Sequence, residues 1–101
     1  MRDMNNDIEV KHSEIGNKGL FVLKRDGKRM GRLEYQRLSS FTISAQHTEV
    51  DKGFEGQGVA KRLFSVLVGW ARENDQKIEP LCPFFKSMFD RNPDVKEELG
   101  A

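Results

Sequence analysis

Cysteine is nearly absent from this sequence, and the single residue, Cys82, cannot form a disulfide within the chain. One thiol without a partner agrees with a reducing compartment, and no cluster of metal ligands is visible, so we expect no metal site. An excess of one charge is also missing, because 17 Lys and Arg residues nearly balance 16 Asp and Glu residues. Without an overall basic field, we expect no nucleic-acid partner.

Long apolar runs are missing as well. No stretch approaches the ~20 apolar residues that span a bilayer, and residues 1–7 lack the apolar centre of a signal peptide. We therefore expect a soluble, cytoplasmic protein with no membrane partner. We also expect it to be a monomer or a weak homodimer. With 101 residues, of which 37% are hydrophobic, the chain can build one modest core, which predicts a single domain over residues 1–101.

Alternation of apolar and polar residues predicts four consecutive antiparallel strands in the first half of the chain. They cover residues 8–12, 20–25, 29–37 and 41–48, with a loop at 13–19 and a hairpin turn at Asp26-Gly27. The alternation in the fourth strand predicts that its core-facing side carries Phe41, Ile43, Ala45, His47 and Glu49.

The second half predicts helices around one more strand. Residues 59–74 carry apolar side chains at the spacing of an amphipathic helix, and a short strand follows at 77–81. Because a helix separates this strand from the fourth, the two should be parallel. Pro83 suits the first turn of a helix that ends near residue 91, and a further helical turn or two is expected at 94–99. The fold class is therefore α+β, with strands 1–4 antiparallel, strand 5 parallel, one main helix and a short C-terminal helix.

A glycine-rich loop separates the fourth strand from the main helix. Gly53, Gly56 and Gly58 leave the backbone uncrowded where the helix begins, so unpaired N–H groups and the positive end of the helix dipole converge there. Such a point binds anions, most naturally phosphate, although glycines before a helix can also form only a tight turn. Val59-Ala60 follow Gly58 where a P-loop has Lys and then Ser or Thr, and Lys61 stands where the dinucleotide fingerprint has its third glycine.

The Gly-x-x-Gly-x-Gly spacing of residues 53–58, with Ala60 and a basic pair behind it, resembles the acetyl-coenzyme A loop of GCN5-related N-acetyltransferases. The stretches HTEV, GQGVAKRL and CPFF are similar to the small single-domain YjdJ-type branch of that family. The resemblance covers residues 8–99 and implies a sheet whose fourth and fifth strands splay apart around the co-substrate. Gly53 and Glu55 depart from the family pattern, and residues 13–19 leave no room for the helices that roof the acceptor site in larger members.

The resemblance also implies which residues bind acetyl-coenzyme A. Backbone groups near Thr48-Glu49-Val50 would pair with the pantetheine arm, and the loop with the helix start would hold the diphosphate, so that no metal is needed. The predicted binding residues are Thr48, Val50, Gly53, Gly56, Gln57, Gly58, Val59, Ala60, Lys61, Arg62, Lys86 and Asn92.

Acetyl transfer needs a base for the attacking amine and an acid for the departing thiolate. His47 and Glu49, two apart on one strand, can take the proton, although both can equally be solvated strand-end groups. Cys82 at a helix start can carry the acetyl group or protonate the thiolate, or it can be a small buried apolar residue. Tyr35 lies in the hairpin and not on the last helix, where many members of the family keep a tyrosine acid.

The sequence thus predicts an N-acetyltransferase that moves the acetyl group of acetyl-coenzyme A to an amine on a small molecule or a protein. We expect direct transfer more than an acetyl-cysteine intermediate, because a splayed strand pair already presents the thioester to the amine. Two alternatives stay open. One is a coenzyme A-binding regulatory module without turnover, and the other is an acyltransferase that uses a longer acyl-CoA.

Overall fold

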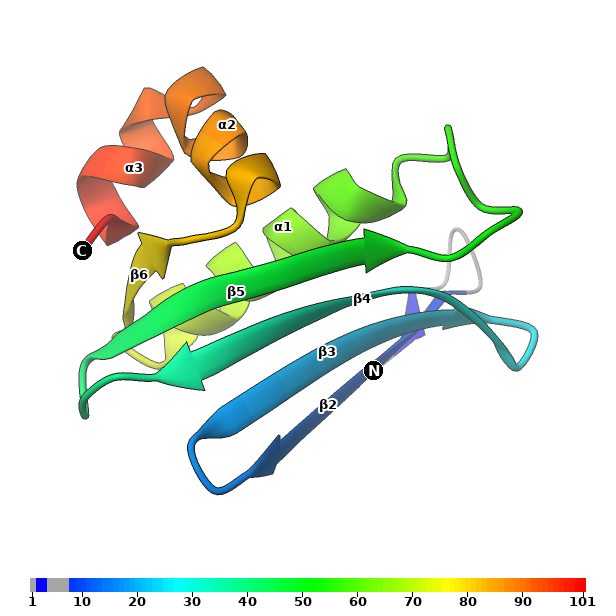
Figure 1. Ribbon diagram of the computed structural model, residues 1–101, viewed down its shortest axis with the longest axis horizontal. Coiled ribbons are helices and arrows are strands. Elements are labelled where there is room, and N and C mark those ends of the chain that lie inside the picture. Colours follow the sequence, from blue (N-terminus) through cyan, green and yellow to red (C-terminus); the bar gives the residue numbers. More distant parts are fainter. Residues whose placement is uncertain (1, 4–7) are drawn as a thin grey trace.

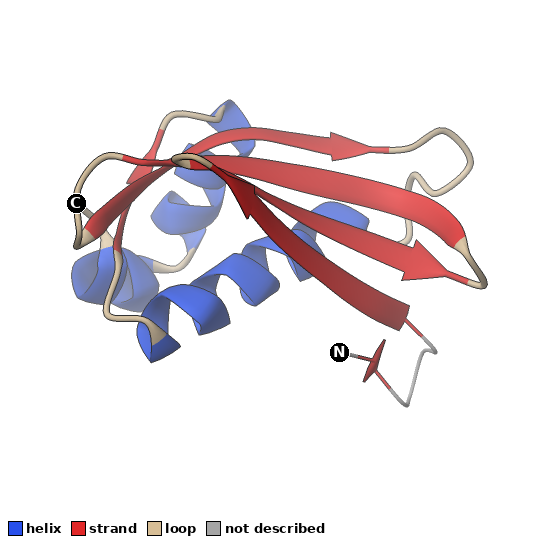
Figure 2. Cartoon of the chain, turned by 90° about the horizontal axis from the view of Figure 1, so that it is seen from below, coloured by secondary structure: helices blue, strands red, loops and turns tan. Residues whose placement is uncertain are grey.

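A computed structural model describes residues 2–3 and 8–101. Six strands form one sheet in the order β1-β2-β3-β4-β5-β6, antiparallel from β1 to β5 and parallel between β5 and β6. All three helices cover one face of this sheet and leave the other face bare (Figures 1 and 2). The elements are β1 (Arg2–Asp3), β2 (Ile8–Ile15), β3 (Lys18–Arg25), β4 (Lys28–Arg37), β5 (Thr42–Val50), α1 (Val59–Glu73), β6 (Lys77–Pro80), α2 (Pro83–Arg91) and α3 (Pro93–Leu99).

The predicted α+β fold, with four antiparallel strands followed by one parallel strand, is confirmed. The two-residue β1 adds a sixth strand that the sequence did not predict. The signal-peptide prediction for residues 1–7 lies outside the described residues except at 2–3. None of the helices in the described part of the chain is long and apolar enough to cross a bilayer.

The loop predicted at residues 13–19 is wrong, because β2 and β3 extend through most of it. Gly16, whose φ is 63°, allows the chain to reverse between Ile15 and Lys18 without a longer loop. Gly19 lies inside β3, where an added Cβ would come within 2.0 Å of the Tyr35 ring. The glycines of this segment therefore serve a tight turn and a close side-chain approach.

The core lies between the sheet and α1. Leu63, Leu67 and Ala71 repeat along one side of α1 and have no exposed surface. Burying one Leu side chain fully away from water stabilises the fold by about 1.5–3 kcal/mol. Phe64 of α1 contacts Phe85 of α2 with ring centroids 4.7 Å apart, and this contact fixes the short helices beside the main one.

A β-bulge interrupts the pairing of β4 with β5. Tyr35 pairs with Ala45, but its neighbour Glu34 pairs with His47, so Gln46 has no partner across the ladder. One extra residue shifts the two-residue alternation, and every side chain beyond it turns to the other face of the sheet. The bulge therefore decides which side chains of β5 point toward the helices.

The prediction that five alternating residues of β5 share a core-facing side is wrong beyond Ala45. After the bulge, Thr48 and Val50 take the core side, while His47 and Glu49 turn to the bare face. Phe41 precedes the strand and is 70% exposed. Only the first part of the predicted pattern, Ile43 and Ala45, is buried as expected.

Candidate active site

A fork opens between β5 and β6. The last register pair between them joins Ala45 to Pro80, and the Ala45 carbonyl then accepts hydrogen bonds from the N–H groups of Leu81 and Cys82, both at 3.0 Å. Here the chain leaves the sheet and enters α2, while β5 runs on to Val50. Within the described residues, no strand pairs with β5 beyond Ala45 on the edge that faces away from β4.

The open edge of β5 presents backbone hydrogen-bonding groups. The Asp51 N–H donates to the Met30 carbonyl at 2.8 Å, so Asp51 faces β4. Because the N–H and C=O directions alternate along a strand, Thr48 and Val50 face away from β4 and toward the fork. These two residues can therefore pair with an extended ligand through their backbone.

The glycine loop holds three residues in the left-handed region. The φ angles of Gly53, Gly56 and Gly58 are 96°, 77° and 75°. A Cβ placed on any of them would meet no atom within 4 Å, so the space above the loop is open. The backbone conformation requires glycine here, and packing within the protein does not.

The start of α1 carries N–H groups that the helix cannot pair. Gly58 caps the helix without a side-chain hydrogen bond, and the first turn contains no acidic residue. The first internal bond runs from the Arg62 N–H to the Gly58 carbonyl at 3.0 Å. The N–H groups of Val59, Ala60 and Lys61 therefore have no partner within the helix, and the helix dipole adds a positive field. This end of α1 can bind an anion.

Basic and acidic side chains both stand near the loop. Arg25 and Arg62 line a hollow of about 100 Å³ beside Gln57, and Arg25 Nη1 donates to the Gln57 Oε1 at 3.3 Å. Arg25 was missed from the sequence, because nothing in the second strand indicates that it meets a loop 32 residues away. Glu55 acts in the opposite sense, since its carboxylate accepts a hydrogen bond from the Gly53 N–H at 2.8 Å.

Cys82 lies on the helix side of the fork. It is 5% exposed, it precedes Pro83 at the first position of α2, and its Sγ is 3.6 Å from the Thr48 Oγ1. The predicted place of Cys82 at a helix start is confirmed. The thiol and the Thr48 hydroxyl thus form a polar contact on the helix side of the opening between the strands.

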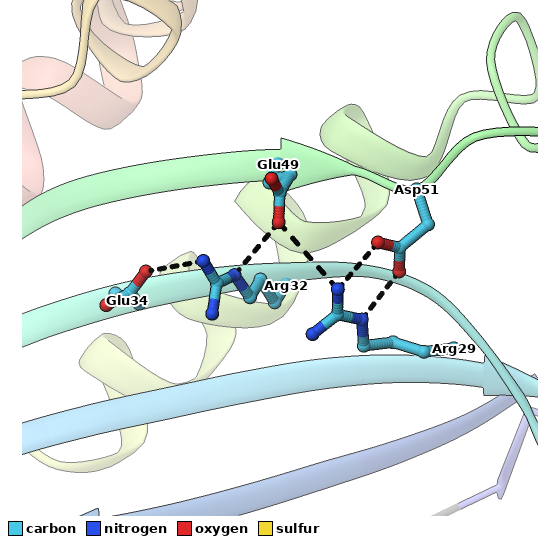
Figure 3. Close-up of polar contacts among 5 residues, drawn as sticks. All are labelled: Arg29, Arg32, Glu34, Glu49 and Asp51. Carbon is cyan, nitrogen blue, oxygen red and sulfur yellow. Dashed lines mark hydrogen bonds and ion pairs between the residues drawn. The ribbon is translucent and has the colours of Figure 1, made fainter.

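Glu49 lies on the bare face of the sheet within a row of alternating charges (Figure 3). Its Oε1 is 3.1 Å from the Arg32 Nε and 3.8 Å from the Arg29 Nη2. The Arg32 contact is an ion pair without hydrogen-bond alignment, because that buried Nε has no hydrogen-bond partner. The row continues to Glu34 at one end and to Asp51 at the other.

The Asp51 end of this row is the more tightly bonded. Arg29 donates two hydrogen bonds of 2.7 Å to the Asp51 carboxylate, and these bonds hold the pKa of Asp51 below its ordinary value. Arg29 is thereby fixed beside Glu49. The arrangement places a carboxylate between two guanidinium groups on an uncovered surface, where a proton acceptor could meet an incoming substrate.

The catalytic candidates therefore occupy two places. Cys82 contacts Thr48 on the helix side, whereas His47 and Glu49 lie on the bare face, and the structure does not bring all of them together. Among the remaining predicted residues, Lys61 and Lys86 are exposed. The side-chain amide of Asn92 donates to the Met88 carbonyl at 2.8 Å at the end of α2, so its side chain already has a structural role.

Tyr35, the only tyrosine, is buried, and its Oη lies 2.7 Å from the His12 Nε2. It is thus engaged in the core, away from the fork. Within the described part of the chain, no group of three or more His, Cys, Asp or Glu side chains is arranged to hold a metal ion.

Known proteins share this fold and sequence pattern. The chain is 33% identical over 61 residues to Protein NATD1 of Xenopus tropicalis, a match that covers 60% of this chain and 56% of that relative's length. It is 27% identical to a GCN5-like protein from Staphylococcus aureus whose solution structure superposes with a TM-score of 0.66, covering 97% of this chain and 91% of that one.

A GNAT family acetyltransferase from Elizabethkingia anophelis, solved with acetyl-CoA bound, has a TM-score of 0.63 over 72% of this chain and 63% of its own. At 13% identity, this likeness shows the fold. The family profile described as GCN5-related N-acetyl-transferase matches residues 20–99. The strand order, the fork and the glycine loop agree with the fold that the family resemblance implies. This chain belongs to the GCN5-related N-acetyltransferase family.

Proposed function

We propose that this protein binds acetyl-coenzyme A and transfers its acetyl group to an amine. One observation carries the proposal: the open edge of β5 beyond Ala45 continues directly into a loop whose left-handed glycines leave unpaired N–H groups at the start of α1. The two features offer successive places for an extended chain and for a phosphate. The family and the acetyl-CoA complex of a structural neighbour support the same ligand.

The binding roles follow from this geometry. The backbone groups of Thr48 and Val50 pair with the amides of the pantetheine arm, as an added strand would. The diphosphate lies against the backbone of residues 56–60, where the helix dipole favours negative charge. Lys61 and Arg62 add positive charge in the first turn, and Arg25 adds a third cation from β3.

The chemistry begins with a neutral amine, whose nitrogen attacks the thioester carbonyl carbon. Glu49 on the bare face accepts the proton that the nitrogen loses, directly or through a water, and His47 is the second candidate. The C–S bond breaks, and the departing thiolate takes a proton from the Cys82 thiol or from water. We propose direct transfer, because Cys82 is 5% exposed and lies on the opposite side of the sheet from Glu49.

The test is the release of free coenzyme A thiol from acetyl-CoA in the presence of a panel of amines. We expect release above background hydrolysis with at least one amine, rising with pH as the amine loses its proton. Intact-protein mass spectrometry in the absence of an amine should show no acetyl adduct, and Cys82→Ser should keep measurable turnover. A stable acetyl group on Cys82 that moves to added amine would replace direct transfer with a two-step route.

The regulatory module is the second candidate. The Glu55 carboxylate on the Gly53 N–H and the bare face without a roof for the acceptor favour it. Tight binding of acetyl-CoA with no turnover on the amine panel would select the module, and faster turnover of a longer acyl-CoA would select an acyltransferase of different chain preference. A cytoplasmic location and a monomeric or weakly dimeric state stay predictions, to be tested by fractionation and sedimentation.

A further inference from the structure

A groove of about 450 Å³ lies between α1 and the β2–β3 side of the sheet. This region is separate from the fork, because β4 stands between β3 and β5 in the strand order. The groove is lined by side chains of β2 and β3 on one wall and by residues 65–73 of α1 on the other. Its volume is within the range of about 300–1,000 Å³ that is usual for small-molecule sites.

Aromatic rings from both walls line the groove. The His12 ring stacks on Phe21 with centroids 4.0 Å apart and an angle of 11° between the planes, and Trp70 meets both rings edge-on at 5.4 and 6.0 Å. The hydroxyl of Tyr35 contacts the His12 Nε2 at 2.7 Å and holds the imidazole in place. Burial lowers the pKa of His12, so the ring is uncharged near neutral pH and the wall is apolar.

The α1 wall also carries a carboxylate. Glu73, the last residue of α1, is exposed and has no ion-pair partner among the described side chains. A carboxylate in the last turn of a helix is disfavoured by the helix dipole, so helix stability does not explain this residue. Together, Glu73 and the helix C-terminus make this end of the groove negative.

Gly69 keeps the helix wall of the groove open. It lies in the interior of α1, where glycine is a poor helix former, and a Cβ placed on it would meet no atom within 4 Å. Packing within the described residues therefore does not require glycine at this position. Its effect is to expose the helix backbone beside Trp70 and to leave the groove unfilled.

We propose that this groove binds a small organic amine, a cation carried on an apolar or aromatic body. Aromatic rings stack on the aromatic body of such a ligand. The Arg37 guanidinium already lies 5.5 Å from the centre of the Trp70 ring, so the positive charge of the ligand is met by the unpaired Glu73 carboxylate at the end of the groove. The uncharged His12 wall suits the apolar part of such a ligand. This site is distinct from the proposed acetyl-transfer site and does not depend on it.

Trp70 is the only tryptophan, so its fluorescence reports ligand binding to the groove directly. Three probes share one apolar body and differ in charge: phenethylamine, phenethyl alcohol and phenylacetate. Titrated without acetyl-CoA, phenethylamine should give a saturable change and bind about 2- to 5-fold more tightly than the alcohol, as an exposed ion pair allows. Phenylacetate should bind the most weakly.

Two variants test the parts of the site separately. Glu73→Gln should remove the preference for the amine over the alcohol, whereas Glu97→Gln, a change in an exposed carboxylate on α3, should keep it. Gly69→Leu should fill the groove and abolish binding of all three probes. Because the space at Gly69 is open and leucine favours helices, this variant should keep its circular dichroism spectrum.

The proposal fails if Trp70 fluorescence shows no saturation, if the three probes bind equally, or if a folded Gly69→Leu variant binds as the wild type does. A fluorescence change that follows protein concentration without any probe, together with sedimentation as a dimer, would assign the groove to a second copy of the chain and overturn it. Acetyl-transfer assays play no part in these outcomes, so a failure here leaves the proposed function standing.

Discussion

Replacing Gly58 by alanine tests whether the open space above the loop receives a phosphate. Gly58 has a φ of 75°, and alanine in this left-handed conformation costs about 1 kcal/mol of stability. For a domain of this size, that loss lowers the melting temperature by about 4–8 °C. The protein should therefore stay folded at room temperature, and binding can be measured on the folded state.

The expected loss of affinity has a separate cause. The added methyl group projects into space that no protein atom occupies, so its effect on binding comes from crowding the ligand. Displacing a phosphate from one backbone N–H removes a charge-assisted hydrogen bond, which contributes about 1.5–3 kcal/mol. The dissociation constant of acetyl-CoA, measured by calorimetry, should rise about 10- to 100-fold.

Gly16 supplies the matched control. Its φ is 63°, a Cβ there also meets no atom within 4 Å, and it lies in the β2–β3 turn. Gly16→Ala should therefore lose a similar amount of stability and bind acetyl-CoA as the wild type does. If Gly58→Ala loses stability but keeps its affinity, the ligand does not approach this part of the backbone and the reasoning is refuted.

Three further predictions concern the bare face of the sheet and the core. Glu49→Gln should lower the rate of amine-dependent coenzyme A release by about 100-fold, the lower range for general-base catalysis, whereas Glu34→Gln on the same face should change it little; equal losses would contradict a base at Glu49. Burial, with help from a hydrogen bond to Glu14, raises the pKa of Tyr35 well above its ordinary value of 10, so the stability it contributes is intact below that pH and is lost as the pH rises further. Ultraviolet absorbance of this single tyrosine should therefore show phenolate only where circular dichroism shows unfolding, and a phenolate signal in folded protein near pH 10 would disprove it. Gly19→Ala should destabilise the fold by about 1–3 kcal/mol, because the new Cβ would lie within 2.0 Å of the Tyr35 ring, and a denaturant midpoint equal to that of the wild type would contradict this packing.

Local patterns in the sequence were sufficient for the elements of this fold. The helical period of α1 and the two-residue alternation of the strands depend only on which residues are apolar. Burying the apolar side of a helix or strand stabilises it in any fold. The glycine loop was also readable, because positive φ angles at a helix start select glycine in any context. These signals were enough to predict the parallel β6 and the glycine-capped start of α1.

Only the tertiary structure decided which side of the sheet each site residue occupies. The bulge at Gln46 arises where β5 pairs with β4, and no local pattern in β5 announces it, so the sequence wrongly placed His47 and Glu49 on the core side. Contacts over long separations were equally hidden, such as Arg25 on Gln57 and Cys82 on Thr48. The periodicity of a sequence shows which residues are apolar. The residue that a given side chain contacts in another strand or loop is decided only when distant segments pack together.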